Sequence, residues 1–291
     1  MKPRILLCSH DAGGANLLLA WALEHPNNSY IALLSGPAVG IYSASNLIFN
    51  SIDSIESIPR NISQFICSTG WQTDFEKILI EHCVSNNKKV AVYLDHWVNY
   101  RARFVFKNHL LVPDQIWVVD EEALIVATKE MPEVHKIKVI GNYYEETIIN
   151  NIKNNSPPSK NSASILLCLE PIRENIDVVA LWDDLVNFLQ FKCNGCQFII
   201  RPHPSGELDG SEYLKDKLAS FANVRMSRCT LEADLACCRT VIGYQSSIFS
   251  IAHKLNKEVI SYFPAQAMKP LLPHAYINYI PSNSSLKESL P

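Results

Sequence analysis

Long hydrophobic runs and clusters of positive charge are both missing from this 291-residue sequence. The apolar stretch at the N-terminus is about four residues long, against the ~7–15 of an export signal and the ~18 of a membrane span. We therefore expect a cytoplasmic protein without an integral membrane segment, while peripheral association with a membrane stays open. No basic run exceeds the pair Lys88–Lys89, and the formal net charge is −3. Nucleic acid is therefore not an expected partner.

Sequence motifs typical of metal-binding or dinucleotide-binding sites are also missing. Cys193 and Cys196 form a single CxxC pair, without the second pair or nearby histidine that a structural zinc site needs. The nine cysteines are an odd number, and without an export signal we expect reduced thiols. The loop after the first expected strand is not GxGxxG, and no DxD-like metal motif stands out. We expect neither a metal nor another resident cofactor.

Short apolar runs alternate with helical patterns along almost the whole chain, and an apolar fraction of 47% is ample for two cores. Strands are expected at 4–8, 29–35, 65–69, 89–95, 115–120, 136–142, 164–170, 197–204, 223–227, 240–245 and 258–264. Helices are expected at 15–25, 38–47, 74–84, 121–130, 175–191, 211–221, 230–238 and 246–256. Such alternation implies parallel strands joined by right-handed crossovers. The predicted fold class is α/β, with two Rossmann-like domains facing each other across a cleft.

A segment rich in Asn, Ser, Pro and Lys interrupts this alternation at 151–163. Such a composition is typical of a linker between domains. We expect an N-terminal domain over 1–152, a linker over 153–163 and a C-terminal domain over 164–291.

The loop after the first expected strand has the sequence SHDAGGAN (9–16). Gly13 and Gly14 let the backbone approach a ligand or an opposing loop closely, and the next helix offers free N–H groups. His10 and Asp11 are two neighbouring titratable side chains there, which makes them candidate catalytic residues. A carboxylate needs no unusual pKa to be ionised at neutral pH. The alternative, in which Asp11 only caps the helix, stays open.

A second polar loop, residues 95–103, follows the buried strand expected at 89–95. Loops at the carboxyl ends of strands are where α/β folds place ligands. We expect this loop to bind an acceptor substrate or to close over a donor, through Asp95, His96, Asn99, Tyr100 and Arg101. In the alternative, its aromatic residues only cover the edge of the sheet.

Two further motifs lie in the second half of the chain. The first is Arg201-Pro202-His203-Pro204, in which two prolines hold a histidine in a rigid turn, where it and Arg201 can bind or protonate a phosphate. The second is Gln245-Ser246-Ser247 at the expected start of a helix, where hydroxyls and free amides can bind an anion, although Ser246 can also be a plain helix cap. Glu170 is a weaker candidate for a contact with a ribose or base.

These two motifs, in this order, resemble the nucleotide-binding half of GT-B glycosyltransferases. His203-Pro204 is similar to the HP motif of bacterial sialyltransferases, polysialyltransferases and Kdo transferases, and Ser246-Ser247 to their serine motif. In that group both motifs hold the phosphate of a CMP-sugar, and an acidic residue of the N-terminal domain is the base, here Asp11. Two features differ: Asp11-Ala12-Gly13 stands where those sialyltransferases have an acidic pair and a glycine, and no glutamate follows the serine pair.

The resemblance implies an inverting enzyme of polysaccharide biosynthesis that uses no metal. It would transfer a nonulosonic or Kdo-like acidic sugar from a CMP donor to a glycan or other hydroxyl acceptor. Asp11, or alternatively His10, would deprotonate the acceptor, and His203 with the two serines would stabilise the departing phosphate. Four alternatives stay open: a UDP-sugar glycosyltransferase, a UDP-sugar 2-epimerase, a CDP-polyol phosphotransferase and a non-catalytic nucleotide-sugar-binding protein.

Overall fold

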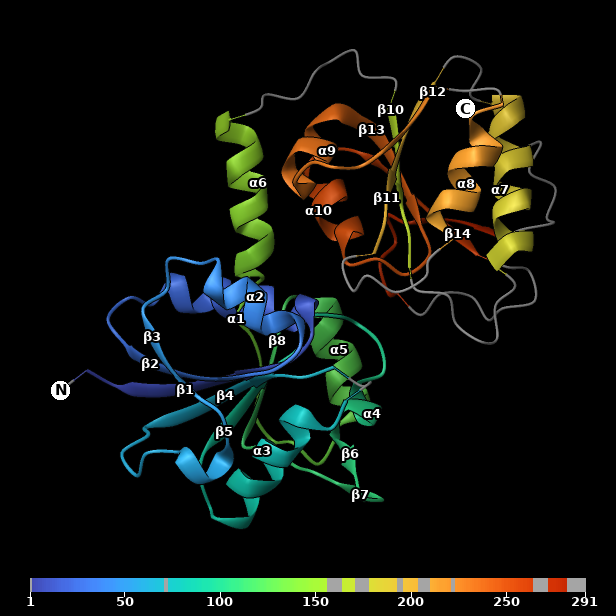
Figure 1. Cartoon of the computed structure of the whole chain (residues 1–291). Coiled ribbons are helices and arrows are strands. Elements are labelled where there is room, and N and C mark those ends of the chain that lie inside the picture. Colours follow the sequence, from blue (N-terminus) through green and yellow to red (C-terminus); the bar gives the residue numbers. More distant parts are fainter. Residues whose placement is uncertain are drawn as a thin grey trace. The chain divides into compact units, whose positions relative to one another are not determined.

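The computed structural model describes residues 2–70, 73–155, 164–170, 178–192, 196–203, 210–220, 223–263 and 272–281. The chain divides into two compact units, Met1–Glu146 and Thr147–Pro291. Each unit has one main parallel sheet with helices beside it (Figure 1). Within the described residues, no helix is both long enough and apolar enough to cross a membrane.

The first unit contains a seven-stranded sheet with the order β3-β2-β1-β4-β5-β8-β9. Its strands are parallel and largely apolar. They span β1 (Arg4–Ser9), β2 (Ser29–Leu34), β3 (Phe49–Ile52), β4 (Gln64–Ser68), β5 (Val90–Tyr93), β8 (Gln115–Val118) and β9 (Ile137–Val139). The strand order reverses between β1 and β4, so the loops after these two strands diverge and leave a crevice in which such folds bind ligands.

Helices cover both faces of this sheet: α1 and α2 lie on one face and α3 on the other (Figure 1). Right-handed crossovers explain this, because the chain moves in opposite directions along the sheet before and after the reversal. The helices are α1 (Ala12–Leu23), α2 (Pro37–Ser43), α3 (Phe75–Ser85), α4 (Tyr100–Phe104) and α5 (Glu121–Glu130). Helix α6 (Tyr143–Asn155) crosses the boundary between the two units, which lies between Glu146 and Thr147. A 3₁₀ turn (Ile55–Ser57) and a small hairpin of β6 (Val105–Phe106) and β7 (His109–Leu110) complete the unit.

The second unit contains a six-stranded parallel sheet with the order β12-β11-β10-β13-β14-β15. Its strands are β10 (Ser164–Cys168), β11 (Gln197–Arg201), β12 (Asn223–Met226), β13 (Cys238–Gly243), β14 (Glu258–Phe263) and β15 (Asn278–Pro281). Its helices are α7 (Val178–Lys192), α8 (Ser211–Leu218), α9 (Leu231–Cys237) and α10 (Ile248–Lys254). The strand order reverses again between β10 and β13. The loops that follow these two strands are therefore the second place where we expect a ligand to bind.

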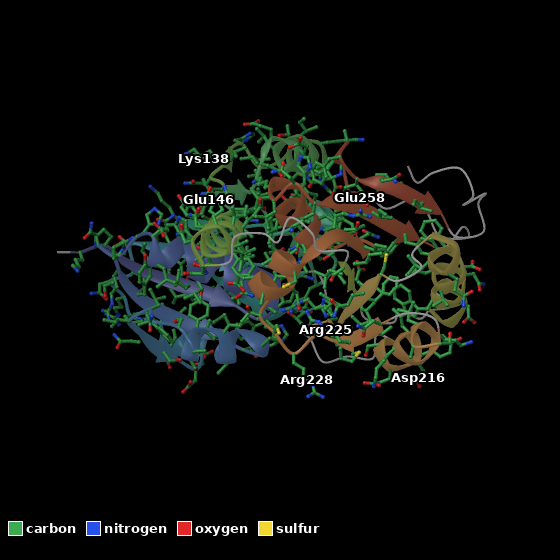
Figure 2. The ribbon with its side chains drawn as sticks, turned by 90° about the horizontal axis from the view of Figure 1, so that it is seen from above. Lys138, Glu146, Asp216, Arg225, Arg228 and Glu258 are labelled. Atoms are coloured by element: carbon green, nitrogen blue, oxygen red, sulfur yellow. The ribbon has the colours of Figure 1, made fainter. Side chains whose placement is uncertain are left out.

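Each unit has its own hydrophobic core, and most charged residues of the described part lie on the surface. In the second unit Leu167, Leu185 and Phe198 are almost completely buried in one cluster between the sheet and its helices. Charged side chains such as Lys138 on β9 and Asp216 on α8 point away from their own units (Figure 2).

The expected α/β class with two Rossmann-like units is confirmed. The sequence pattern predicts neither the short strands β3 and β15 nor helix α6. The apolar residues that α6 buries are Ile148, Ile149 and Ile152, in a segment otherwise rich in asparagine. Helix α6 continues to Asn155, into the stretch expected to be linker, and the rest of that linker, 156–163, lies outside the described residues.

Candidate active site

The carboxyl ends of β1, β4 and β5 bring together several polar residues from distant parts of the sequence. Asp11 follows β1 and occupies the N-cap position of α1, but its side chain makes no capping hydrogen bond. Its Oδ1 atom is buried and has no hydrogen-bond partner among the described residues. Helix capping therefore does not explain Asp11. A buried carboxylate oxygen without a partner is costly, which makes this position a candidate for a functional role.

Two glycines leave the space that the carboxylates of Asp11 and Asp95 fill. A Cβ atom at Gly14 would lie 2.8 Å from Oδ1 of Asp11, and one at Gly13 would overlap Oδ2 of Asp95. On the loop after β4, a Cβ at Gly70 would lie 3.6 Å from Asp11, which is ordinary contact. Glycine at positions 13 and 14 thus allows the carboxylates of Asp11 and Asp95 to pack against the first turn of α1.

A buried arginine holds the second carboxylate. Arg103 of α4 pairs with Asp95 at 3.0 Å between Nη1 and Oδ1, and its side chain is only 5% exposed. The guanidinium also donates to the backbone carbonyls of Thr69 and Val98. Arg103 therefore ties the loop after β5 to the loop after β4. The sequence pattern included Arg103 in the 95–103 loop but gave no reason to choose it over Arg101.

A third carboxylate, Glu76, comes from the first turn of α3 and is fully buried. Its Oε1 accepts a hydrogen bond of 2.7 Å from the backbone N–H of His10. Burial raises the pKa of Glu76 to about 7, although that hydrogen bond acts in the opposite direction. The sequence pattern does not distinguish this residue, because a glutamate within a helical pattern usually faces the solvent.

These surroundings change the acid–base behaviour of Asp11. Burial and, to a smaller extent, the nearby charges of Asp95 and Glu76 together raise its pKa to about 7, and the charge of Arg103 acts in the opposite direction. This differs from the sequence-based expectation of an ordinary carboxylate. A group with this pKa is half ionised near neutral pH, where it can both accept and return a proton.

His10, the other candidate base, is held differently. Its Nε2 lies 2.6 Å from where a Cβ of Gly36 would be, and Gly36 has a left-handed backbone with φ of 54°. The ring therefore packs against the loop between β2 and α2. Its Nδ1 is buried and has no partner among the described residues.

The residues expected to bind an acceptor do not form one group in the structure. Asp95 joins the carboxylates beside β1, and His96 next to it is partly exposed. Tyr100 is completely buried, and Asn99 adopts a left-handed backbone that begins α4. Arg101 is half exposed and pairs with Glu133 at 3.0 Å.

The candidate nucleotide-binding residues of the second unit meet at the strand reversal between β10 and β13. Glu170, just after β10, accepts a hydrogen bond of 2.5 Å from the backbone N–H of Gln245, just after β13. Ser246 accepts from the backbone N–H of Ile248 at 3.3 Å, so it does cap the turn, and Ser247 precedes α10. A Cβ at Gly243 would lie only 3.0 Å from the carbonyl oxygen of Cys168, so the two strand ends approach closely.

The remaining candidates follow β11, the neighbour of β10. Arg201 ends the strand and pairs with Asp234 of α9 at 2.9 Å. His203 is partly buried two residues later, and Pro204 lies outside the described residues. The sequence pattern does not distinguish Asp234, because an aspartate in the first turn of an amphipathic helix is usual on a solvent-facing surface.

No protein-family model matches this chain, and no curated protein sequence matches it either. Solved structures do match. The UDP-GlcNAc 2-epimerase from Neisseria meningitidis, bound to UDP-GlcNAc, is 11% identical with a TM-score of 0.60, over 89% of this chain and 82% of that one. A glycosyltransferase from Rickettsia africae is 12% identical with a TM-score of 0.56, over 97% and 85%. The wall teichoic acid polymerase TagF is 10% identical with a TM-score of 0.50, over 89% and 70%.

The chain has the GT-B fold. At 10–12% identity the likeness establishes the fold alone. The expected GT-B class is thereby supported, whereas the sialyltransferase and Kdo-transferase group stays a prediction.

Proposed function

We propose that the protein is a glycosyltransferase that moves a sugar from a nucleotide donor to a hydroxyl acceptor, with Asp11 as general base. The observation that carries this proposal is the buried, uncapped carboxylate of Asp11 between Asp95 and Glu76 at the ligand-binding edge of the first sheet. A carboxylate that is half ionised near pH 7 is well suited to remove a proton from a sugar hydroxyl.

In the reaction, the acceptor oxygen attacks the anomeric carbon of the donor and forms the new glycosidic bond. Its proton passes to Asp11, and the bond from the anomeric carbon to the phosphate oxygen breaks with inversion. The nucleotide leaves with the bonding electrons. The second unit would bind this nucleotide, with the ends of β10, β11 and β13 supplying Glu170, His203 and the amides and hydroxyls of 245–247.

Two classes of donor have separate support. Uridine diphosphate sugars are favoured by the GT-B-fold epimerase that binds UDP-GlcNAc, and this is the donor class that we propose. The HP and serine motifs favour a CMP-linked acidic sugar, which is the second candidate.

A UDP-sugar 2-epimerase is the alternative activity that the site geometry also favours. Epimerisation needs a group that removes a proton from carbon and a group that returns one, and two carboxyls here have a pKa of about 7. Such a reaction needs no acceptor.

The test incubates the purified protein with UDP-GlcNAc, UDP-glucose or CMP-sialic acid in D₂O, with and without a mixture of oligosaccharide acceptors. A transferase releases nucleotide in step with a new glycoside and leaves the carbon-bound hydrogens unexchanged. An epimerase produces the epimer without acceptor and incorporates deuterium at the reacting carbon.

Asp11→Asn should reduce transfer ~10²–10⁴-fold while donor binding survives. Asp53→Asn, an exposed aspartate of the same unit, is the control. Full transfer by Asp11→Asn together with loss of transfer by His10→Ala would reassign the base to His10.

A further inference from the structure

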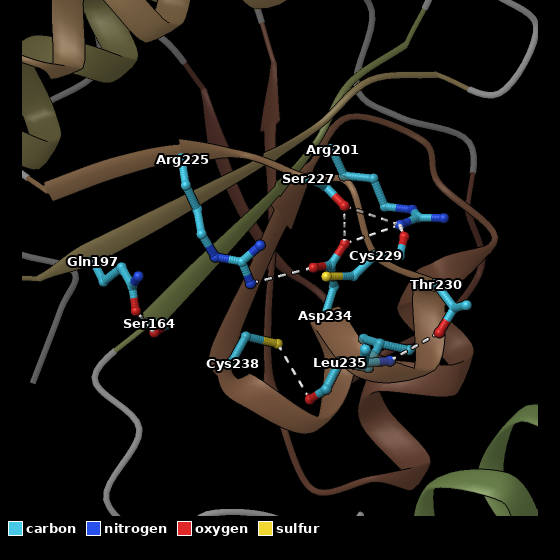
Figure 3. A network of polar contacts seen from close by, with 11 residues as sticks. Ser164, Gln197, Arg201, Arg225, Ser227, Cys229, Thr230, Asp234, Leu235 and Cys238 are labelled. Carbon is cyan, nitrogen blue, oxygen red and sulfur yellow. Dashed lines mark hydrogen bonds and ion pairs between the residues drawn. The ribbon is translucent and has the colours of Figure 1, made fainter.

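The second unit contains a buried charge that the proposed reaction does not use. Asp234 of α9 has no exposed surface, and its carboxylate is bound by Arg201, Arg225 and Ser227 (Figure 3). A buried carboxylate is tolerated only when it is paired and hydrogen-bonded. Two guanidinium groups on one carboxylate exceed that need, so the group as a whole keeps a positive charge.

Arg201 uses only one of its nitrogen atoms for these contacts. Its Nη1 donates to Oδ2 of Asp234 at 2.9 Å, to the carbonyl oxygen of Cys229 at 3.1 Å and to Oγ of Ser227 at 3.3 Å. Within the described residues, Nε and Nη2 make no hydrogen bond, and Figure 3 shows the rest of the guanidinium directed away from Asp234. The side chain as a whole is 25% exposed, which is consistent with a second edge that a ligand can reach.

The free edge is at the place where this fold binds ligands. Arg201 is the last residue of β11 and pairs in register with Cys168, the last residue of β10. Its backbone is doubly fixed, because its carbonyl accepts from the N–H of Leu169 at 3.1 Å and because Pro202 restricts the preceding residue to an extended conformation. Arg201 is therefore a rigid cation at the end of β11, one strand away from the reversal between β10 and β13 and two residues before His203.

We propose that the Nε–Nη2 edge of Arg201 binds two oxygens of the donor diphosphate, and that Asp234 is the positioning residue that holds this edge in place. The inference rests on the proposed function in taking the ligand to be a nucleotide donor. The planar fork of a guanidinium matches two oxygens of a phosphate. Because Asp234 already holds the Arg201 side chain in place, ligand binding costs little further side-chain entropy. The recognised chemistry is thus a diphosphate oxyanion.

The competing explanation is that Arg201 only neutralises Asp234. Arg201→Lys separates the two roles, because a lysine keeps the positive charge beside Asp234 but has no fork with which to bind two phosphate oxygens. Arg228→Lys is the matched control: Arg228 is exposed, lies in the turn after β12 and points outward (Figure 2).

The experiment measures binding of uridine, UDP and inorganic pyrophosphate to the full-length protein by titration calorimetry. The wild type and Arg228→Lys should bind UDP more tightly than uridine. In Arg201→Lys the affinity for UDP and pyrophosphate should fall about tenfold, as expected for a lost charge-assisted hydrogen bond, and the affinity for uridine should not change. Asp234→Asn, which frees Arg201, should also reduce the ratio of the affinity for UDP to the affinity for uridine, as Arg201→Lys does. A purely structural role of Asp234 would lower the melting temperature without changing this ratio.

The outcomes separate this inference from the proposed function. An unchanged ratio of UDP to uridine affinity in Arg201→Lys overturns the inference and leaves the transferase proposal standing. Binding of pyrophosphate that depends on Arg201, without any binding of nucleosides or nucleotides, upholds the inference and overturns the proposed function. Absence of binding for all three compounds in the wild type overturns both. If Asp234→Asn does not fold, Arg201→Lys alone decides.

Discussion

At the scale of single residues, the protonation of Asp11 links stability to pH. The pKa of Asp11 is raised to about 7 in the folded protein, against about 4 for an ordinary aspartate. Between these two values the folded protein binds more protons than the unfolded chain does. The free energy of unfolding therefore falls as the pH rises through this range and levels off above about pH 7.

Asp11→Asn should remove this contribution. We expect the variant to be more stable than the wild type at pH 8, by about 1–3 kcal/mol, with the difference closing near pH 4. Thermal or urea unfolding at both pH values measures it, with Asp53→Asn as an exposed control. A variant that is less stable than the wild type at pH 8 would contradict the burial of an ionised Asp11. Greater stability together with lost activity would identify a functional group that is held at a cost to the fold.

Gly13 offers a second test at this scale, because a side chain there would meet Asp95. Gly13→Ala should destabilise the protein by about 1–3 kcal/mol and lower turnover, because Asp95 must move away from Arg103 and Asp11. Gly40→Ala is the matched control: a Cβ at Gly40, also in a helix, has no neighbour within 4 Å. The control should be stabilised by up to about 1 kcal/mol through helix propensity. Equal effects of the two substitutions, measured by urea unfolding, would show that a side chain at position 13 does not clash with Asp95.

At the scale of elements, the long apolar strands could be predicted and the contacts between their loops only in part. Residues 4–8, 65–69 and 89–95 are apolar enough to predict β1, β4 and β5. The loops after β1 and β5, which the sequence also indicates as polar, do come together in the structure, since a Cβ at Gly13 would meet Asp95. Glu76 could not be found in this way, since only the packing of α3 against the sheet brings it to His10. Likewise, no sequence pattern distinguishes Arg103, which is buried, from Arg101, which is exposed two positions earlier on the short helix α4.

Helix α3 gives a prediction at this scale, because its first turn places Glu76 beside Asp11. Glu76→Gln should keep the hydrogen bond from the N–H of His10, since an amide oxygen can accept it, and should remove a negative charge that raises the pKa of Asp11. We expect the acid limb of the pH profile of kcat/KM to move to lower pH by about 0.5–1 unit. Glu81→Gln, on the same helix but paired with Lys107, should leave the profile in place. A shift to higher pH would contradict the electrostatic coupling of the two carboxyls.

At the scale of the whole molecule, the alternation of strands and helices predicts two Rossmann-like units, and the resemblance of the HP and serine motifs implies the GT-B class. The fold does not determine the chemistry. The same architecture occurs in an epimerase, a glycosyltransferase and a teichoic acid polymerase. Because one architecture serves several activities, function must be argued from the residues of the site, and those that we propose here are Asp11 and Arg201. The base of the nucleotide is least predictable from sequence, because its recognition depends on loop conformation rather than on a local pattern.

The nucleotide can be identified by its effect on the stability of the whole chain. A ligand that binds only the folded state raises the free energy of unfolding by RT ln(1 + [L]/Kd), or about 2.7 kcal/mol at a hundredfold excess over Kd. In a thermal screen of UDP, CMP, CDP, GDP and ADP, we expect UDP to raise the melting temperature most. Asp11→Asn should respond to UDP as the wild type does, because Asp11 belongs to the first unit, whereas Arg201→Lys should respond less. A larger response to CMP than to UDP would instead support the donor class implied by the HP and serine motifs. If no nucleotide changes the melting temperature, while acceptor glycans do, the second unit does not bind a nucleotide donor and the transferase proposal fails.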